Sequence, residues 1–376
     1  MAEHGRAAFP LGHVQLSLTE GPLFPGPFMS DWRLWVALAF GALVALVALV
    51  VWVVPRDSAA PEPDPDGAGC NGRVELCDRT LDQVALAGSH NAMSVEGEPG
   101  WHVGFQRRTI SDQLEAGVRA LLIDVYPGYR DGDLVRTDLR QPITAAAAKS
   151  DVRPDERSIL GRLGVSVGAV PPKDADIRPY LCHAYCELGA TDLVEQLGHV
   201  ADFVTSHPND VFVLVLQDYI SGDKTQRAFE QAGLMEHVWP LAPDDPTPTL
   251  RDMVTKRKNV VVLSENHGGE VPWMPAAYDV TEETPYEFKT QADFTCAPNR
   301  GGTGKPLFLL NHWLDYVGRP TPGKARRVNR RAVLERRLDQ CRRERGRVPG
   351  IIAVDFADTG DVVRVVDRLN RGDALE

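Results

Sequence analysis

Short apolar runs alternate with helical patterns along most of this chain. Runs bounded by turn residues are typical of buried strands, and they lie at 84–87, 120–125, 180–183, 211–217, 259–263, 307–311 and 351–356. Helical patterns fall between them, for example at 110–116, 191–206, 224–232, 325–345 and 361–370. Strands that alternate with helices on this scale form parallel sheets, so the pattern predicts an α/β fold.

Two α/β architectures fit this alternation. Residues 70–376 are long enough for a TIM (β/α) barrel, which typically takes roughly 250 residues, and seven runs rather than eight predict an irregular barrel. A doubly wound sheet is the alternative, although no GxGxxG turn follows the first run to support a dinucleotide site. Residues 137–176 interrupt the alternation with an Ala-rich patch and weak periodicity, and we expect an inserted loop or lid there.

The N-terminal part of the chain has a different pattern. Residues 34–54 carry no charge and are flanked by charged residues, which matches the roughly 20 residues that a helix needs to cross a bilayer. We therefore predict a disordered tail at 1–31, a transmembrane helix at 32–54 and a Pro-rich acidic linker at 55–69. A cleaved signal peptide fits less well, because its apolar core is shorter and begins nearer the N-terminus.

The net charge and the cysteines indicate the partners and the cellular location of the folded part. The net charge of −11 argues against nucleic acid as the main partner. All six cysteines follow the apolar stretch, which suggests disulfides and an extracytoplasmic domain on a single-pass membrane protein. Close spacing favours Cys70–Cys77 and Cys182–Cys186, which leaves Cys296–Cys341. Free buried thiols are the alternative, and a zinc site is disfavoured because no two CxxC pairs occur.

Two histidines follow predicted strands. His90 lies in Gly88-Ser89-His90-Asn91 after the first run, and His183 ends the run at 180–183. The edge where barrel strands end is the usual place for catalytic groups. An imidazole titrates near neutral pH, so two of them at this edge can serve as a general base and a general acid. Either histidine alone could equally be structural.

Several motifs in order resemble one family over about residues 78–370. They are Gly88-Ser-His90-Asn91, the segment 116–125 that contains Asp124, Leu181-Cys-His183-x-x-Cys186, Pro208-Asn-Asp-Val211, Glu283-Thr-Pro-Tyr286, Cys296…Asn299-Arg300, Asn311-His-Trp-Leu-Asp315 and Val354-Asp355-Phe356. This set resembles the X-region of phosphatidylinositol-specific phospholipase C. It is most similar to secreted and membrane-anchored phospholipase-C-like phosphodiesterases of fungi and bacteria. The resemblance implies a distorted TIM barrel.

The resemblance also implies roles for three residues. Cleavage of a phosphodiester by an internal hydroxyl needs a base for the hydroxyl proton and an acid for the leaving oxygen. The family pattern assigns His90 to the attacking side and His183 to the leaving-group side. Asp355 matches an aspartate that orients the first histidine and stabilises its imidazolium form. A helix N-cap is the alternative role for Asp355.

The resemblance leaves the use of a metal open. Asp124 stands where metal-independent relatives carry an arginine and calcium-dependent relatives carry a carboxylate ligand, and Asn91 could add a carbonyl oxygen. Leu122 and Gln217 occupy the approximate places of two further carboxylates, and of these Gln217 alone could ligate. Turn formation by Asn91 and a salt bridge of Asp124 are the alternatives. The sequence thus allows either no cofactor or Ca²⁺.

Four further residues follow predicted strands at the same edge and are candidate substrate contacts. They are Glu265, His267, His312 and Trp313, each of which could instead satisfy loop backbone or pack in the core.

The sequence therefore predicts a phospholipase-C-like phosphodiesterase whose substrate is an inositol phospholipid or another phosphodiester. A glycerophosphodiester phosphodiesterase is one alternative, but it should show His-Arg near the first strand and Glu-x-Asp after the second. A non-catalytic lipid- or glycan-binding module of the cell envelope on the same barrel is the other.

Overall fold

The computed structural model describes residues 60–245, 247–314 and 320–375. The predicted tail at 1–31 and the predicted transmembrane helix at 32–54 lie outside these residues. Within the described ranges, no helix is both long and apolar enough to cross a membrane. The described end of the predicted linker packs on the folded part, because the Asp64 amide donates to Asn209 Oδ1 at 2.8 Å.

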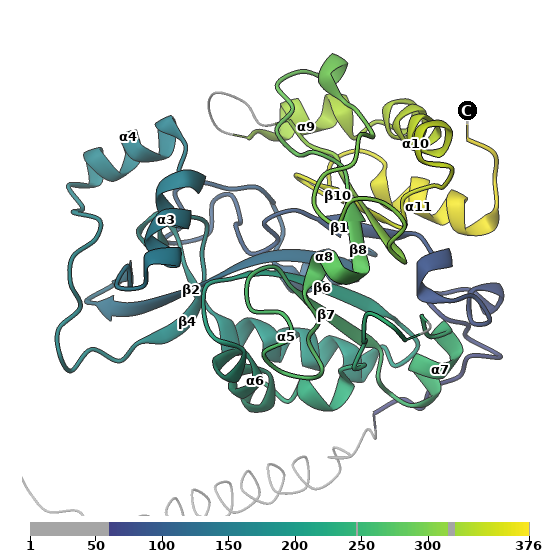
Figure 1. Ribbon diagram of the computed structural model, residues 1–376, viewed down its shortest axis with the longest axis horizontal. Helices are drawn as coiled ribbons and strands as arrows, with labels where there is room; N and C mark the ends of the chain where they lie inside the picture. Colours follow the sequence, from purple (N-terminus) through teal and green to yellow (C-terminus); the bar gives the residue numbers. More distant parts are fainter. Residues whose placement is uncertain (1–59, 246, 315–319, 376) are drawn as a thin grey trace, which may run out of the picture. The chain divides into compact units, whose positions relative to one another are not determined.

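The strands form one 10-stranded sheet that curves like an incomplete barrel (Figure 1). Parallel pairing runs in the order β7-β6-β2-β1-β10-β9-β8. These strands are β1 (Leu86–Ser89), β2 (Ala120–Asp131), β6 (Phe212–Asp218), β7 (Val260–Ser264), β8 (Thr281–Glu283), β9 (Leu307–Asn311) and β10 (Ile351–Val354). In the described residues β7 and β8 share no ladder, so the predicted barrel is present as an open sheet.

Two details of the strand prediction were wrong. The run at 180–183 corresponds to β4 (Arg178–Leu181), which is antiparallel to the far end of β2 and not a parallel barrel strand. The pattern also missed β8, because its three residues are Thr281, Glu282 and Glu283. Glu283 forms an ion pair with Arg300, and Glu282 forms one with Arg345, so both carboxylates are neutralised. A strand with this sequence contains no apolar run that could be recognised. Two short strands, β3 (Leu134–Thr137) and β5 (Thr191–Asp192), extend this antiparallel region.

Helices pack around the sheet. In Figure 1, α5 (Leu193–Ser206), α6 (Gly222–Gln231) and α7 (Leu250–Thr255) lie below it, and α10 (Arg331–Arg345) and α11 (Val362–Arg371) lie near β10. The other elements are α2 (Ile110–Glu115), α8 (Ala277–Val280), α9 (Pro322–Val328) and the 3₁₀ turns η1 (Val74–Leu76), η2 (Leu81–Gln83), η3 (Cys186–Leu188), η4 (Met235–His237) and η5 (Gln291–Asp293).

The helix predicted at 325–345 is divided between α9 and α10. Asn329 ends α9, and its side-chain amide donates to the backbone carbonyls of Asp355 and Thr359. These bonds tie the break to the loop after β10, where a candidate site residue lies.

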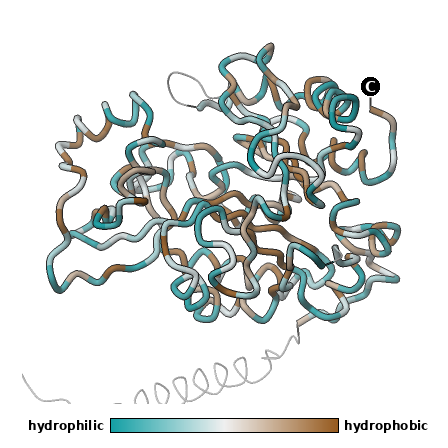
Figure 2. The backbone as a smooth tube through the Cα atoms, viewed as in Figure 1, coloured by the Kyte–Doolittle hydropathy of each residue, from teal (hydrophilic) through white to brown (hydrophobic). Residues whose placement is uncertain are grey.

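Both faces of the parallel strands are buried, as Figure 2 shows by the apolar colouring of the central strands. Alternate residues such as Leu214 and Leu216 pack against the surrounding helices. Their neighbours Val213 and Val215 pack inside the curve with the segment that contains Leu76. Successive side chains of a strand lie on opposite faces of the sheet. One set therefore faces the helices, and the other faces the inside of the curve, where the cavity lies.

Half of the insertion at 137–176 is helical, where its weak periodicity predicts an inserted loop or lid. It contains α3 (Pro142–Asp151) and α4 (Pro154–Leu163), each of which begins with proline at a position that needs no backbone donor. Their buried residues, such as Ala148 and Ile159, join a separate apolar cluster with Tyr126 of β2 and Tyr180 of β4. The apolar face is narrow, which explains the weak pattern.

All six cysteines are paired as the spacing predicts. The disulfides are Cys70–Cys77, Cys182–Cys186 and Cys296–Cys341. Cys182–Cys186 closes the loop that carries His183, and Cys296–Cys341 ties the loop after β8 to α10.

Candidate active site

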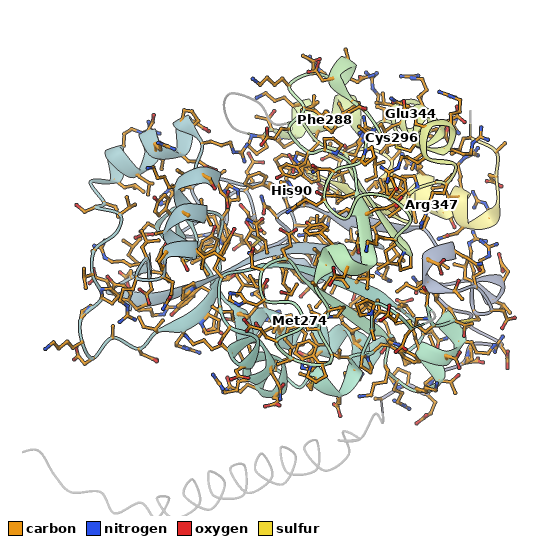
Figure 3. All side chains as sticks on the ribbon, in the orientation of Figure 1. His90, Met274, Phe288, Cys296, Glu344 and Arg347 are labelled. Atoms are coloured by element: carbon orange, nitrogen blue, oxygen red, sulfur yellow. A yellow bond between two sulfur atoms is a disulfide. The ribbon has the colours of Figure 1, made fainter. Side chains whose placement is uncertain are left out.

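A cavity of about 480 Å³ opens at the carboxyl ends of the parallel strands. Its lining comes from all seven of these strands or the loops that follow them, from His183 after β4, and from the insertion. The polar or aromatic lining residues used below are His90, Asn91, Phe105, Asp124, Asp151, Arg153, His183, Gln217, Glu265, Arg300, Asn311, Trp313 and Asp355. Figure 3 shows His90 near the middle of the molecule in this view.

His90 is held on three sides. Its backbone N–H donates to the Val354 carbonyl at 3.0 Å, which continues the pairing of β1 with β10. Its Nδ1 lies 2.8 Å from Oδ1 of Asp355, and its ring stacks on Trp313 with centroids 3.8 Å apart. These contacts fix the imidazole and leave Nε2 as the nitrogen available to a substrate. Burial lowers the pKa of His90, although Asp355 opposes this shift.

Asp355 does not serve as the helix cap considered as its alternative role. The residue at the N-terminal boundary of α11 is Asp361, and the Asp355 carboxylate instead bonds His90.

His183 has a carboxylate partner from the insertion. Its Nδ1 lies 3.4 Å from Oε1 of Glu156 in the first turn of α4, and Glu156 is almost completely buried. The angles do not satisfy a hydrogen bond, so the contact is an ion pair. Burial acts to lower the pKa of His183, but the interactions with Glu156 and the charge of Asp124 together outweigh burial, and the pKa is raised. His183 thus favours the protonated state more than a free imidazole does.

Phe105 brings the two histidines and an arginine together. Its ring centroid lies 5.4 Å from that of His90 and 4.9 Å from that of His183. The Arg153 guanidinium carbon lies 4.5 Å from the same ring. One buried aromatic ring therefore contacts both imidazoles and the cation, so all three groups share one end of the cavity.

A family model described as PI-PLC X matches residues 163–370. The chain belongs to the PI-PLC X family. It is 23% identical to PI-PLC X domain-containing protein 1 of Arthroderma benhamiae, over 80% of this chain and 89% of that protein. It is 25% identical to an uncharacterized secreted protein of the same fungus, over 68% of this chain and 50% of that protein.

The chain is also similar, at low sequence identity, to solved structures. The phosphatidylinositol-specific phospholipase C of Staphylococcus aureus matches with 14% identity and a TM-score of 0.45, over 78% of this chain and 95% of its own.

The predicted metal ligands of this PI-PLC X chain do not fit calcium. Oriented to satisfy both groups, the Asn91 amide donates to Asp124 at 3.1 and 3.3 Å. The Gln217 amide donates to Asp151 and to Tyr219. Asp124 is thus the one carboxylate of the three, whereas calcium takes six to eight oxygens. The described residues contain no group of three His, Cys, Asp or Glu side chains that could hold a metal ion.

Asp124 is also poorly suited to hold a charge where it stands. Burial raises its pKa to about 8, and the nearby charges of Asp151 and Glu265 add to this shift while His183 opposes it. The Asp124 carboxyl group is therefore largely protonated at neutral pH.

The four predicted substrate contacts divide into two pairs. Glu265 and Trp313 line the cavity. His267 lies outside that lining, where its Nδ1 pairs with Glu270 at 2.8 Å. His312 is buried on the other side, where its Nε2 lies 3.0 Å from the Val328 carbonyl and its pKa falls to about 4 because of burial.

A second polar cluster lies around Glu265, and sequence reasoning assigned no role to its other members, Arg300, Glu283 and Asn311. Arg300 bonds Glu265 at 2.8 Å and Glu283 of β8 at 2.5 and 3.1 Å. Asn311, at the end of β9, donates to the same Glu283 at 3.0 Å. Arg300 belongs to a motif that carries the family resemblance, so the sequence held a signal for this group.

Sequence reasoning also missed Glu156 and Arg153. They lie in the insertion, whose pattern predicted a loop, and their contacts to Phe105 and His183 depend on tertiary packing.

Proposed function

We propose that this PI-PLC X protein is a phosphodiesterase that uses His90 as general base and His183 as general acid. One observation carries the proposal: two imidazoles share a cavity, each has its own carboxylate, and their pKa values are shifted in opposite directions. A base must be neutral and an acid protonated at the same pH, and these opposite shifts provide that combination.

The reaction follows from these roles. His90 Nε2 takes the proton of a substrate hydroxyl that lies next to the phosphodiester, and the resulting oxygen attacks phosphorus. The bond from phosphorus to the leaving oxygen breaks, and His183 donates its proton to that oxygen. The products are a cyclic phosphodiester and an alcohol. Asp355 stabilises the imidazolium that forms on His90, as a buried carboxylate does beside a catalytic histidine.

We propose an inositol phospholipid as substrate. Family membership supports this choice, since family names refer to phosphatidylinositol. The chemistry of the cavity agrees, because Arg300, Glu265 and Asn311 line it and offer donors and acceptors to a polyhydroxylated ring. In this substrate the attacking hydroxyl belongs to the inositol ring and the leaving oxygen to diacylglycerol.

Release of diacylglycerol from phosphatidylinositol vesicles tests the proposal. The wild-type protein should release it, and His90→Ala and His183→Ala should each lower the rate by about 10²–10⁴, the usual contribution of a general acid or base. His267→Ala is the matched control, because this histidine lies outside the cavity lining. Activity that survives in both alanine variants would sink the mechanism. A wild-type protein that binds such vesicles but cleaves no phosphodiester would favour a binding module.

The three disulfides and the similarity to a secreted fungal protein support an extracytoplasmic location for the folded part. We infer from the uncharged stretch at 34–54 that this part is tethered to a membrane. Alkaline carbonate extraction of membranes from cells that express the full chain tests the tether, and protein found in the soluble fraction would refute it.

A further inference from the structure

The geometry points to Arg153 as the residue that binds the substrate's phosphate, with Glu156 as the positioning residue for both Arg153 and His183. This inference rests on the proposed phosphodiesterase function. It assigns a catalytic role to the insertion at 137–176, which contributes the cation and the second carboxylate of the site.

Glu156 lies between the two groups that it would position. One carboxylate oxygen lies 3.4 Å from His183 Nδ1 and 3.6 Å from Arg153 Nε. The other accepts the backbone N–H of Arg153 at 2.7 Å, which also caps the start of α4. A carboxylate buried this deeply is stable only when it is paired with cations and donors. Glu156 therefore fixes the first turn of α4 against the cavity and the imidazole of His183 beside it.

Arg153 lies where a reacting phosphate would need a cation. Its guanidinium packs over Phe105, whose ring also contacts His90 and His183. A phosphorus atom under attack must lie between the base and the acid, so the non-bridging oxygens fall at this end of the cavity. These oxygens gain negative charge in the transition state, and a guanidinium suits them because it can donate two parallel hydrogen bonds.

The charges of the rest of the cavity make such a cation necessary. Asp151, Glu265, Glu287 and Asp355 all belong to the lining. The other lining arginine of the described residues, Arg300, bonds Glu283 and Glu265 and packs on Tyr278 and Tyr286. Of the lining arginines in the described chain, Arg153 is the one that shares Phe105 with both histidines.

The insertion is docked by bonds near the cavity. Asp151, at the end of α3, accepts from Gln217 Nε2 at 3.0 Å, from Tyr126 Oη at 3.3 Å and from Tyr219 Oη at 3.4 Å. These partners belong to β2 and to the end of β6, and α4 begins three residues after Asp151. The strands thus set the position from which Arg153 and Glu156 reach the site.

Rates of phosphatidylinositol cleavage by the full chain test the role of Arg153. Arg153→Gln should lower kcat by about 10²–10³, the usual loss when one donor to a developing oxyanion is removed, and Arg153→Lys should restore part of it. Arg162→Gln, on the exposed side of α4, is the matched control and should keep the wild-type rate. An Arg153→Gln variant as fast as the control would overturn the assignment.

The role of Glu156 has a readout that does not require activity. Glu156→Gln keeps the size of the side chain and removes its charge, so the pKa of His183, followed by NMR, should fall relative to wild type. An unchanged pKa would overturn the positioning role.

Titration with inositol 1-phosphate separates this inference from the proposed function. Should the wild-type protein cleave no phosphodiester yet bind this ligand at least tenfold more tightly than Arg153→Gln does, the proposed function fails and the phosphate site stands. Equal affinities for wild type and Arg153→Gln would overturn the phosphate site whatever the activity.

Discussion

The indole of Trp313 lies flat against the imidazole of His90, with ring centroids 3.8 Å apart and planes 3° from parallel. Because Asp355 holds Nδ1 from the edge, the stack and the hydrogen bond together leave the ring one orientation. Trp313→Ala should therefore lower kcat by about tenfold or more, since small misplacements of a catalytic group are costly. Trp313→Phe should recover much of the loss. A full rate in the alanine variant, measured by diacylglycerol release, would refute this positioning role.

Asp355→Asn should be more damaging than loss of the stack. The amide cannot stabilise the imidazolium and can favour the wrong tautomer, a change that costs about 10⁴ in kcat at a comparable aspartate–histidine pair. The same change should lower the pKa of His90 further, since Asp355 opposes the effect of burial. Steady-state rates and an NMR titration of His90 check both expectations, and a loss below about tenfold would contradict them.

The pH profile of kcat/KM should be bell-shaped. The acid limb reports protonation of His90, whose pKa is lowered, so activity should persist below the ordinary histidine pKa of about 6.5. The alkaline limb reports loss of the proton from His183, whose pKa is raised, so it should lie above about 6.5. Glu156→Gln should move only the alkaline limb, and it should move that limb to lower pH.

Chelators should leave the activity unchanged. Asn91 and Gln217 direct amide donors at carboxylates, and Asp124 adds a single carboxylate whose pKa is about 8. Rates measured in EGTA and in millimolar Ca²⁺ should agree within about twofold, since a donor set this small is a poor match for calcium. A loss in EGTA that Ca²⁺ restores would show that oxygen ligands beyond these three complete a calcium site.

Removal of the Cys296–Cys341 disulfide should destabilise the protein. The bridge spans 45 residues and holds the β8 region to α10, and a loop of this length gives about 4 kcal/mol in the chain-entropy model. Denaturant unfolding of the double Cys→Ser variant measures the change in the free energy of unfolding. A change below about 1 kcal/mol would mean that the reduced, unfolded chain is already constrained there.

The half of the site built on adjacent strands could be predicted from the sequence. His90 and Asp355 each follow an apolar run, and β1 pairs with β10, so two strand-end residues meet. Which of the two neighbours His312 and Trp313 faces the cavity could not be predicted in the same way. Successive residues leave a strand on opposite faces, and which face becomes the cavity depends on how the sheet curves.

The other half depends on packing that leaves little trace in the sequence. Glu156 and His183 meet because α4 docks on the antiparallel extension of β2, and α4 has too few apolar residues to signal that contact. β8 could not be recognised in the sequence because two of its three buried residues are glutamates. The arginines that neutralise them are distant in the sequence and pair with them only in the folded chain.

The pairing of β1 with β10 also determines when the site can form. His90 and its partner Asp355 are 265 positions apart in the chain. During synthesis, the strand that carries His90 therefore emerges long before the strand that completes its dyad. A growing chain would display the first histidine without its carboxylate, so the base becomes oriented only after nearly all of the folded part has been made. The topology in this way delays assembly of the candidate site until the domain is whole.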